Sequence, residues 1–235
     1  MAAPPARGGL PTGAEKTRRV REMFDAIAPR YELVNLCISL GLDAGWRRRT
    51  VAALGLRPGA IVLDVAAGTG DLATAARRVG LRPVALDLSM GMLESGAGAP
   101  AAQCDAAALP VRDGAADGVV CGFALRNFTD LEGSLREMAR ALRPGGRAAL
   151  LEVGAPAHPL LRAGYSLWFD RVVPLIGAAL SDRAAYRYLP ASVAYLPEPD
   201  EMRALLERVG FDAVEHQLLS GGCSQLYVAT RGDAQ

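Results

Sequence analysis

Short apolar segments alternate with amphipathic ones between residues 60 and 153, and this alternation restricts the fold more than any other feature of the sequence. The apolar segments have the length of strands, and the segments between them carry helical spacing. Repeated strand–helix units pair their strands in parallel through right-handed crossovers. The expected strands are 60–65, 83–88, 101–104, 118–122 and 147–153, and the clearest helices are 71–79 and 131–142.

Two further strands, 213–219 and 224–230, follow a helix expected over 200–209 and are separated by a glycine turn. A tight turn joins antiparallel strands, so one strand at or near a sheet edge should run against the others. The sequence therefore predicts an α/β fold with a doubly wound, mostly parallel, seven-stranded sheet of Rossmann-like type.

The region before the first strand has a helical pattern from 14 to 54, with breaks at Pro29 and near Gly41. Residues 1–13 are rich in Pro, Gly and Ala and are expected to form a flexible tail. Thr129 to Glu132 fits a capping box at the start of the helix over 131–142. We expect a single domain over 14–235, with N-terminal helices and an insertion at 155–195 that forms the substrate side.

Charge and composition argue against several classes of site. A formal net charge of +1 gives no bulk attraction to nucleic acid. The apolar stretch 159–180 is interrupted by three charged residues and Pro174, so it does not make a membrane span. The four cysteines form no C-x-x-C pair and the two histidines lie on separate elements, so neither a disulfide framework nor a metal site is expected. We expect a cytoplasmic protein.

A glycine-rich loop, LDVAAGTGD at 63–71, joins the first strand to the helix that follows it. Gly68 and Gly70 permit a sharp turn and bring helix N–H groups close to a ligand above the strand. Asp87 ends the second strand, at the position where a carboxylate accepts hydrogen bonds from ribose hydroxyls. This arrangement predicts a site for a ligand that contains a nucleoside.

The same loop satisfies the G-x-G-x-x-A pattern of nicotinamide-dependent oxidoreductases, which are the principal alternative. However, about 60 residues precede the first strand, whereas dinucleotide domains usually open with it. Asp64 and Asp71 bracket the loop, and carboxylates suit a cationic sulfonium and its amino group better than a pyrophosphate. Lys16 is the only lysine, so no Tyr-x-x-x-Lys pair exists. These features favour S-adenosylmethionine as the ligand.

Three segments outside the loop carry a more specific pattern. The first is FDAIA at 24–28 with Tyr31, Asn35, Ser39, Gly41 and Trp46-Arg47; the second is RNFTD at 126–130, leading to RPGG at 143–146; the third is YRYLP at 186–190 with Ser192 and Pro197. With these segments the chain resembles the menaquinone and ubiquinone biosynthesis C-methyltransferase family over nearly all of its length after the tail.

The resemblance implies a class I S-adenosylmethionine-dependent methyltransferase that acts on a ring carbon of a prenylated hydroquinone. It implies a cofactor site made by the loop, by Asp87 at the ribose and by residues near the adenine. The whole expected set is Asp64, Ala66, Gly68, Thr69, Gly70, Asp87, Leu88, Asp105, Ala106 and Gly122. Two positions depart from the family pattern: Asp43 stands where histidine is frequent, and Gly122 stands where many members have serine.

Methyl transfer to carbon requires an electron-rich ring, which a deprotonated hydroxyl provides. Arg126 is expected to stabilise that phenolate, but a guanidinium stays protonated and cannot accept the proton. A water held by Arg126, Asp25 or Tyr31 is the expected acceptor, and Asn127 completes the expected catalytic set. The alternatives are a turn residue for Asn127 and an ordinary core or rim aromatic for Tyr31.

The substrate side leaves further alternatives open. The stretch 160–188 is either an amphipathic core helix or a lid over the prenyl chain that touches the membrane surface. The arginine- and alanine-rich composition is typical of a GC-rich genome and favours a naphthoquinol, so that demethylmenaquinol would become menaquinol. Other candidates are a C- or O-methyltransferase of aromatic natural products and a non-catalytic cofactor- or quinone-binding protein.

Overall fold

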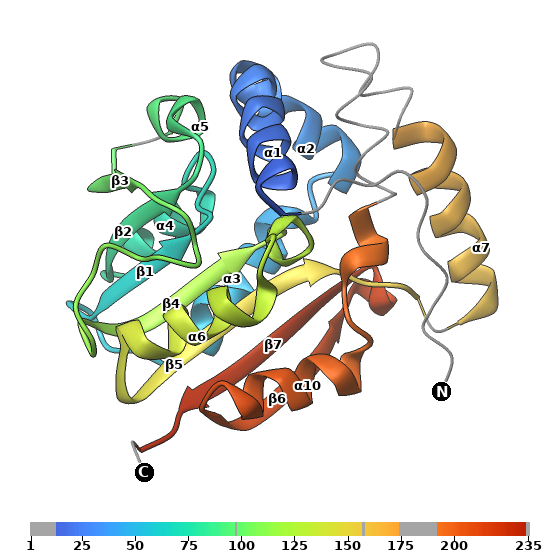
Figure 1. Cartoon of the computed structure of the whole chain (residues 1–235). Helices are drawn as coiled ribbons and strands as arrows, with labels where there is room; N and C mark the ends of the chain where they lie inside the picture. The colour runs from blue at the N-terminus through green and yellow to red at the C-terminus, as the bar shows by residue number, and fades with distance from the viewer. Residues whose placement is uncertain (1–12, 97, 157, 174–191, 234–235) are drawn as a thin grey trace.

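The computed structural model describes residues 13–96, 98–156, 158–173 and 192–233, which build a seven-stranded sheet in the order β3-β2-β1-β4-β5-β7-β6 (Figure 1). The strands are β1 (Ile61–Val65), β2 (Arg82–Asp87), β3 (Ala101–Gln103), β4 (Ala116–Gly122), β5 (Leu142–Val153), β6 (Phe211–Leu219) and β7 (Ser224–Arg231). β7 pairs antiparallel with both neighbours, and the other adjacent pairs are parallel. The doubly wound, mostly parallel sheet is confirmed, with its antiparallel strand one position in from an edge.

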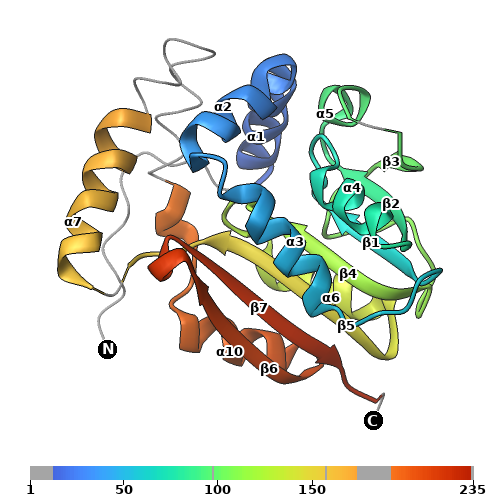
Figure 2. The same cartoon turned by 180° about the vertical axis from the view of Figure 1, so that it is seen from behind.

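Helices cover both faces of the sheet. Leu135 of α6 and Leu206 of α10 belong to one apolar cluster, and Val51 of α3 and Leu72 of α4 belong to the other. The central strands are therefore buried on both faces, which explains their continuous apolar runs. Figure 1 shows α6 and α10 in front of the sheet, and Figure 2 shows α3 on the opposite face. The bounds are α3 (Asp43–Ala53), α4 (Asp71–Arg78), α6 (Leu131–Ala141) and α10 (Pro199–Arg208).

Two N-terminal helices, α1 (Gly13–Ile27) and α2 (Tyr31–Ser39), stand near the carboxyl ends of the strands, with the short helix α5 (Met90–Glu94) beside α1 (Figures 1 and 2). The strand order reverses direction between β1 and β4, and such a switch point opens a ligand crevice at this end of a sheet. The three helices thus surround the place where a ligand is expected.

The expected breaks in the N-terminal helical region are confirmed. Pro29 lies in a 3₁₀ turn, Ala28–Arg30, between α1 and α2. Leu40 and Gly41 take left-handed φ values of 52° and 75°, which end α2 before α3 begins. Most of the expected tail, residues 1–12, lies outside the described residues, and Gly13 already belongs to α1.

The predicted capping box is wrong by one residue. Asp130 caps α6, because its carboxylate accepts a hydrogen bond from the Gly133 N–H at 2.8 Å. The Thr129 hydroxyl instead bonds the Thr17 hydroxyl at 2.8 Å, and Glu132 pairs with Arg136 on the helix surface. A contact with α1, distant in sequence, therefore overrides the local pattern.

β5 begins at Leu142, earlier than the expected residue 147, because Leu142 already pairs with Ala116 of β4.

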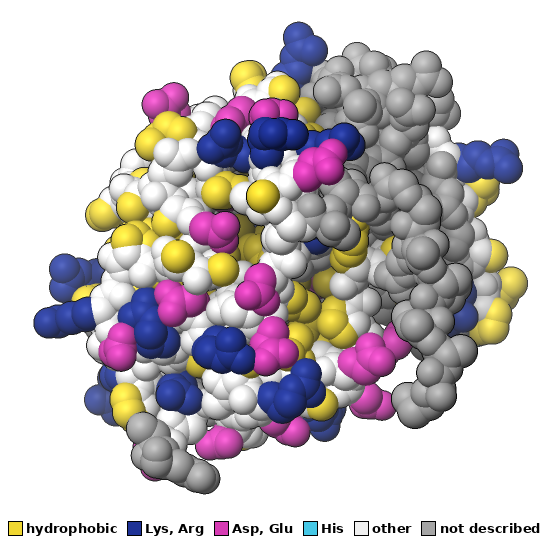
Figure 3. All heavy atoms as spheres, in the orientation of Figure 1, with side chains coloured by type: hydrophobic (Ala, Val, Ile, Leu, Met, Phe, Trp, Pro, Cys, Tyr) yellow, Lys and Arg dark blue, Asp and Glu magenta, His cyan; other side chains and the backbone are white. Residues whose placement is uncertain are grey.

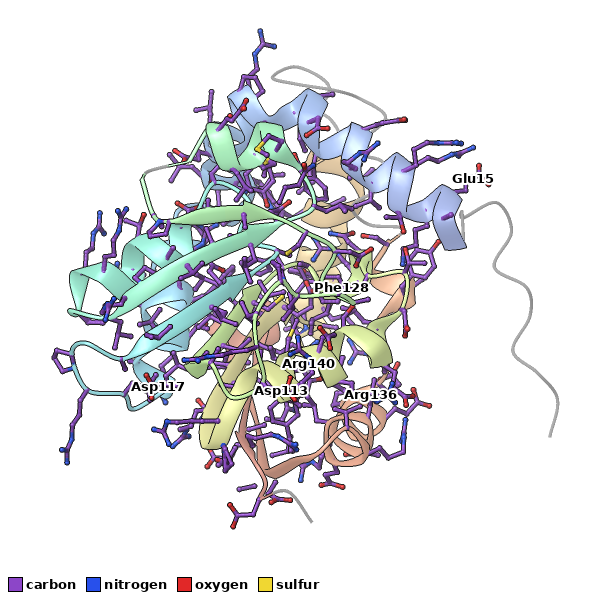
Figure 4. All side chains as sticks on the ribbon, turned by 60° about the vertical axis from the view of Figure 1, so that its left-hand side comes forward. Glu15, Asp113, Asp117, Phe128, Arg136 and Arg140 are labelled. Atoms are coloured by element: carbon purple, nitrogen blue, oxygen red, sulfur yellow. The ribbon has the colours of Figure 1, made fainter. Side chains whose placement is uncertain are left out.

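The segment between β3 and β4 is held by Arg140 of α6. Its guanidinium donates to the Val111 carbonyl at 2.8 Å and to the Asp113 carboxylate at 2.6 Å (Figure 4). These bonds fix the chain that returns from the β3 edge to the centre of the sheet.

The expected insertion at 155–195 is described only in part. α7 (Pro159–Leu167) continues into a π-helical turn, Trp168–Val172, whose Trp168 indole donates to the Ile38 carbonyl of α2 at 3.0 Å. Residues 174–191, which include the YRYLP segment at 186–190, lie outside the described residues. Within the described ranges, no helix is both long and apolar enough to cross a membrane.

Charged side chains of both signs are interspersed over the face seen in Figure 3. This mixing agrees with the net charge of +1 and gives this face no extended basic patch of the kind that binds nucleic acid. In the part of the chain that the structure describes, no group of three His, Cys, Asp or Glu side chains is placed to hold a metal ion.

Candidate active site

Two cavities adjoin beyond the carboxyl ends of the central strands. The first cavity lies between the ends of β1, β2 and β4 and one side of α1, which contributes Thr17 and Phe24 among others. The second cavity lies between α1, α2, α3 and the π-helical turn after α7, with mostly apolar walls. Four residues line both cavities, and these are Phe24, Tyr31, Phe123 and Asn127. The two spaces therefore share a wall, across which a group could pass.

The first cavity gathers most of the expected cofactor residues. It is lined by Ala66, Gly68, Asp87, Leu88, Asp105, Ala106 and Gly122. Asp64 and Thr69 line a smaller recess next to it, and Gly70 lies farther along the loop at the N-cap of α4. The sequence thus predicted the neighbourhood well, although three of its ten residues do not line the first cavity itself.

Backbone geometry explains the glycines at this site. Gly68 has a φ of 57°, and a Cβ there would come within 3.1 Å of the Met92 methyl carbon. At Gly122 a Cβ would come within 2.8 Å of a Leu72 methyl carbon, so the glycine where the family pattern has serine matches the packing here. Ala66 and Phe123 also have positive φ values, 55° and 58°, a strained conformation that clusters at functional sites.

Asp87 organises the loop as well as facing the first cavity. One carboxylate oxygen accepts from the Gly68 N–H at 2.8 Å and the other from the Ser89 N–H at 2.8 Å. Burial raises the pKa of Asp87, while these backbone hydrogen bonds lower it. Each carboxylate oxygen keeps a further lone pair, so Asp87 can also accept from ligand hydroxyls.

Asp64 is almost completely buried, with 1% of its surface exposed. One carboxylate oxygen accepts from the Ala73 N–H at 2.8 Å, whereas the other, Oδ1, has no partner among the described atoms. Burial raises the pKa of Asp64 to about 7. An unsatisfied carboxyl oxygen beside an open recess is suited to a cationic or hydrogen-donating ligand group.

Asp71, by contrast, is neutralised by the protein itself. Its carboxylate forms an ion pair with Arg47, which also pairs with Asp43 at 3.3 Å. The Ser39 hydroxyl donates to the other oxygen of Asp43 at 2.9 Å. This chain of polar groups runs from the glycine loop into the second cavity, which Ser39, Asp43 and Arg47 line.

Arg126 is buried, with 4% of its surface exposed, and lines the second cavity. Its guanidinium forms an ion pair with Glu152 and donates to the Phe123 carbonyl at 2.7 Å and to the Ser192 hydroxyl at 3.1 Å. Its charge is therefore compensated within the protein, which the sequence did not reveal. Arg126 is consequently a fixed donor rather than a free positive charge.

Asn127 and Tyr31 occupy the shared wall. The Asn127 side chain is 9% exposed, and its Oδ1 has no partner among the described atoms. The Tyr31 ring packs edge-on against Phe24, with ring centroids 6.1 Å apart. A buried amide oxygen without a partner is costly unless a ligand satisfies it, so the functional interpretation of Asn127 gains over that of a turn residue.

The structure does not bring Asp25 to either cavity. Its carboxylate accepts a hydrogen bond from the Ser89 hydroxyl and another from the Gly91 N–H at 3.2 Å. Both donors lie at the start of α5, so Asp25 fastens α1 to α5 beside the first cavity. The structure thus gives Asp25 a contact that fastens two helices, and the expectation that it holds a proton-accepting water stays a prediction.

Comparison with known proteins decides the family. The sequence profile of the ubiE/COQ5 methyltransferase family matches residues 12–231. The chain belongs to the ubiE/COQ5 methyltransferase family. It is 41% identical to the demethylmenaquinone methyltransferase of Mycolicibacterium vanbaalenii, covering 90% of this chain and 94% of that one. It is 40% identical to the ubiquinone/menaquinone biosynthesis C-methyltransferase UbiE of Geobacter sulfurreducens, over 93% of this chain and 90% of that one.

Solved structures agree on the fold of this methyltransferase. A methyltransferase from Haloferax volcanii, in complex with the activator Trm112, matches with a TM-score of 0.66 and 18% identity over 89% of this chain and 97% of that one. A methyltransferase from Thermotoga maritima matches with a TM-score of 0.63 and 17% identity over 89% and 98%. These structures confirm the class I fold. The enzyme class and S-adenosylmethionine as cofactor are confirmed by membership of the family.

The described residues of the methyltransferase fit this cofactor. The unpartnered Oδ1 of Asp64 can accept from a cationic amino group, and the Gly68 backbone leaves space that a side chain would fill. Asp87, Leu88, Asp105 and Ala106 all line the first cavity, where they would border a nucleoside. The roles of these residues are implied by the resemblance and stay predictions. The lining of the first cavity supports them.

The sequence did not indicate the ion pair of Glu152 with Arg126 or the contacts of Lys16 in this methyltransferase. Glu152 has 0% of its surface exposed and pairs with Arg126. An acid inside the apolar run 147–153 was the available signal, since a buried strand accepts a charge only when it is paired. Lys16 donates to the Arg126 carbonyl at 3.1 Å, across 110 residues of sequence, and no local pattern could have indicated that contact.

Proposed function

We propose that this methyltransferase methylates a ring carbon of a reduced, prenylated quinone, converting demethylmenaquinol to menaquinol. The observation that carries the proposal is the wall shared by the two cavities. Phe24, Tyr31 and Phe123 offer aromatic surface to both sides of it, and Asn127 offers an unpartnered amide oxygen. A flat, apolar ring with hydroxyl groups matches a cavity with these walls.

The proposed cofactor assignments follow from the first cavity. Asp87 would accept from the ribose hydroxyls, while Leu88, Asp105 and Ala106 would border the adenine. Asp64 would accept from the amino group through its free Oδ1. When bound, S-adenosylmethionine supplies a methyl group on a positively charged sulfur, which is already a strong electrophile. The protein therefore has to orient the ring and deprotonate it.

Arg126 and Asn127 would orient the quinol from one side. Asn127 Oδ1 can accept a hydrogen bond from a ring hydroxyl, and the Arg126 guanidinium is a donor held in place by Glu152 and Ser192. A preorganised donor near a developing phenolate stabilises the charge without reorganising during the reaction. Because Glu152 already balances the charge of Arg126, the phenolate would be stabilised by the hydrogen bond from the guanidinium rather than by a net positive charge.

Asp43 is the proton acceptor that we propose in place of Asp25. Among the described residues, it is the one carboxylate that lines the second cavity. The Ser39 hydroxyl already donates to it, so Ser39 can take the quinol proton while passing its own to Asp43. Deprotonation leaves negative charge on the ring, which is the condition for methylation at carbon. After the methyl group is transferred, the same ring carbon loses its hydrogen as a proton and the ring oxygen regains one, which restores the aromatic quinol. The family's frequent histidine at this position can accept a proton as well.

Contact with a membrane surface is a further part of the proposal, because a prenylated substrate resides in lipid. Leu33 and Leu36 of α2 and Leu40, the residue that follows it, have 52%, 56% and 68% of their surfaces exposed. On α7, Leu160 and Leu167 are 79% and 59% exposed. The Trp168 bond to the Ile38 carbonyl joins these two helical regions beside the second cavity. We call these five leucines the leucine surface and propose that it docks on a bilayer.

A substrate panel tests the proposed reaction. The purified protein is incubated with methyl-labelled S-adenosylmethionine and with reduced naphthoquinols, benzoquinols or simple phenols, each at matched concentrations. We expect label in naphthoquinols, with prenylated ones turned over fastest. Preferred labelling of benzoquinols would change the substrate, and labelling of simple phenols at oxygen would favour an O-methyltransferase of aromatic natural products. Binding without turnover of any acceptor would favour a non-catalytic protein.

A further inference from the structure

Lys16 is a buried cation with three defined neighbours. Its ammonium group donates to the Arg126 carbonyl at 3.1 Å and to the Phe128 carbonyl at 2.8 Å, and it lies 3.8 Å from the centroid of the Tyr195 ring. The residue is 4% exposed, and it is the only lysine in the chain. Lysine is seldom buried unless paired, so these contacts need a reason.

The two carbonyls flank Asn127. Residues 125–127 form a single 3₁₀ turn, and the turn places the Asn127 side chain in the wall shared by the cavities. By holding the peptide oxygens on both sides, Lys16 fixes the backbone that aims the Asn127 amide. A charge-assisted hydrogen bond to each carbonyl is stronger than a neutral one.

The helix that carries Lys16 also forms part of the first cavity. Thr17, Val20 and Arg21 of α1 line that cavity. The Thr17 hydroxyl bonds the Thr129 hydroxyl at 2.8 Å, which gives the same helix a second tie to the same loop. Figure 4 shows Glu15 on the first turn of α1 and Phe128 on the nearby loop. The position of α1 beside the first cavity is therefore tied, through the contacts of Lys16 and Thr17, to the segment 126–129 that borders both cavities.

We propose that Lys16 is a positioning residue that couples the packing of α1 over the first cavity to the placement of Asn127 in the substrate wall. A bound cofactor in contact with α1 would hold the helix against the loop, and the loop would then present Asn127 correctly. The coupling to the cofactor is independent of the quinol, whereas the effect on catalysis rests on the proposed function.

The single lysine makes the first test direct. Wild-type protein is treated with an amine-acylating ester, with or without S-adenosylhomocysteine, and acylation of Lys16 is followed by peptide mass spectrometry. The α-amino group serves as the internal reference. Lys16 is 4% exposed while α1 is packed, so the ester reaches the amine only when α1 moves away. We expect the cofactor product to slow Lys16 acylation at least about tenfold relative to the reference, as linkage between binding and opening requires. Equal rates with and without ligand would overturn the coupling.

The second test asks whether Lys16 acts through Asn127. Lys16→Met keeps the length of the side chain but removes the donor, and Lys16→Arg restores charge and donors. We expect Lys16→Met to lower kcat about tenfold or more with little change in the quinol KM, and Lys16→Arg to recover part of it. In an Asn127→Ala background, Lys16→Met should lower kcat less than about twofold, since effects through a shared partner are not additive.

The matched control is Arg19→Met on the same helix, because Arg19 is exposed and pairs only locally with Glu15 in the described contacts. It should leave both acylation of Lys16 and kcat unchanged. Additive losses in the double variant would contradict a role through Asn127. If Lys16→Met does not fold, the acylation test on the unmodified chain still decides the coupling.

Discussion

Individual acids in this site differ in what surrounds them, and their surroundings assign them different tasks. Asp71 is compensated by Arg47, and Asp87 is satisfied by two backbone N–H groups. Asp64 keeps an unpartnered oxygen and a pKa raised to about 7 by burial. Asp43 stands in the second cavity with Ser39 as its donor. Asp64 therefore has an oxygen left for a ligand. Asp43, which shares Arg47 with Asp71 and accepts from Ser39, is the carboxylate that we propose as proton acceptor.

The pH dependence of cofactor binding should report Asp64. A cationic amino group binds the ionised form of Asp64. Because the pKa of Asp64 is about 7, its carboxyl group is mostly protonated below neutral pH and must lose that proton before it can bind the amino group. Affinity for S-adenosylmethionine should therefore fall as pH falls through about 7, by roughly tenfold between about pH 8 and pH 6. Titration calorimetry measures this. Asp64→Asn should bind more weakly at pH 8 and show a flatter profile; an unchanged slope in that variant would assign the proton to another group.

Removing the proposed proton acceptor should affect the chemical step. Asp43→Asn is expected to lower kcat about 10²-fold or more, the usual range for a general base, with cofactor affinity nearly unchanged. Asp71→Asn is the matched control, because it removes the other carboxylate from Arg47 without emptying the second cavity of its acid. Steady-state methyl transfer and calorimetry separate the two effects. Equal losses in both variants would mean that Arg47, not Asp43, matters for turnover.

At the scale of elements, the N-terminal helices make the site as much as the sheet does. α1 closes one side of the first cavity, and α1, α2 and α3 provide much of the second. The sheet supplies the glycine loop and the acids at its strand ends. The π-helical turn after α7 completes the second cavity through Trp168. Elements added to the sheet thus determine which acceptor can reach the shared wall.

The leucine surface should bind lipid. Replacing Leu36 and Leu40 by serine removes two exposed leucines, one on α2 and one directly after it, without entering the core. Each buried leucine contributes about 1.5–3 kcal/mol, so even partial insertion predicts a loss of about tenfold in binding to vesicles. Cosedimentation with phosphatidylglycerol-containing vesicles measures it. Leu218→Ser on β6, where the leucine is 52% exposed, is the matched control and should bind like the unmodified protein. Equal binding of all three proteins would remove α2 from the surface.

For the whole molecule, the sheet and the cofactor neighbourhood could be predicted because they depend on local patterns. Apolar runs of strand length, the glycine loop and an acid after β2 are all readable over a few residues. The contacts of Asp25, Glu152 and Lys16 could not be predicted, because each joins residues that lie 64, 26 and 110 positions apart, respectively. The predicted capping box of α6 is wrong for the same reason, since the Thr129 hydroxyl forms its hydrogen bond with Thr17. Local sequence indicates which groups are available, and tertiary contacts decide which of them remain free.

In the proposed reaction a methyl group moves from the first cavity, past the shared wall, to a ring carbon of a reduced quinol in the second cavity. The most direct measurement compares dithionite-reduced and oxidised demethylmenaquinone, or a short-chain analogue, with methyl-labelled S-adenosylmethionine under anaerobic conditions. Mass spectrometry and NMR of the product locate the label. Since only the quinol has an ionisable hydroxyl, we predict turnover of the reduced form alone, with the label on a ring carbon. Equal turnover of the oxidised quinone, or label on oxygen, would contradict the account.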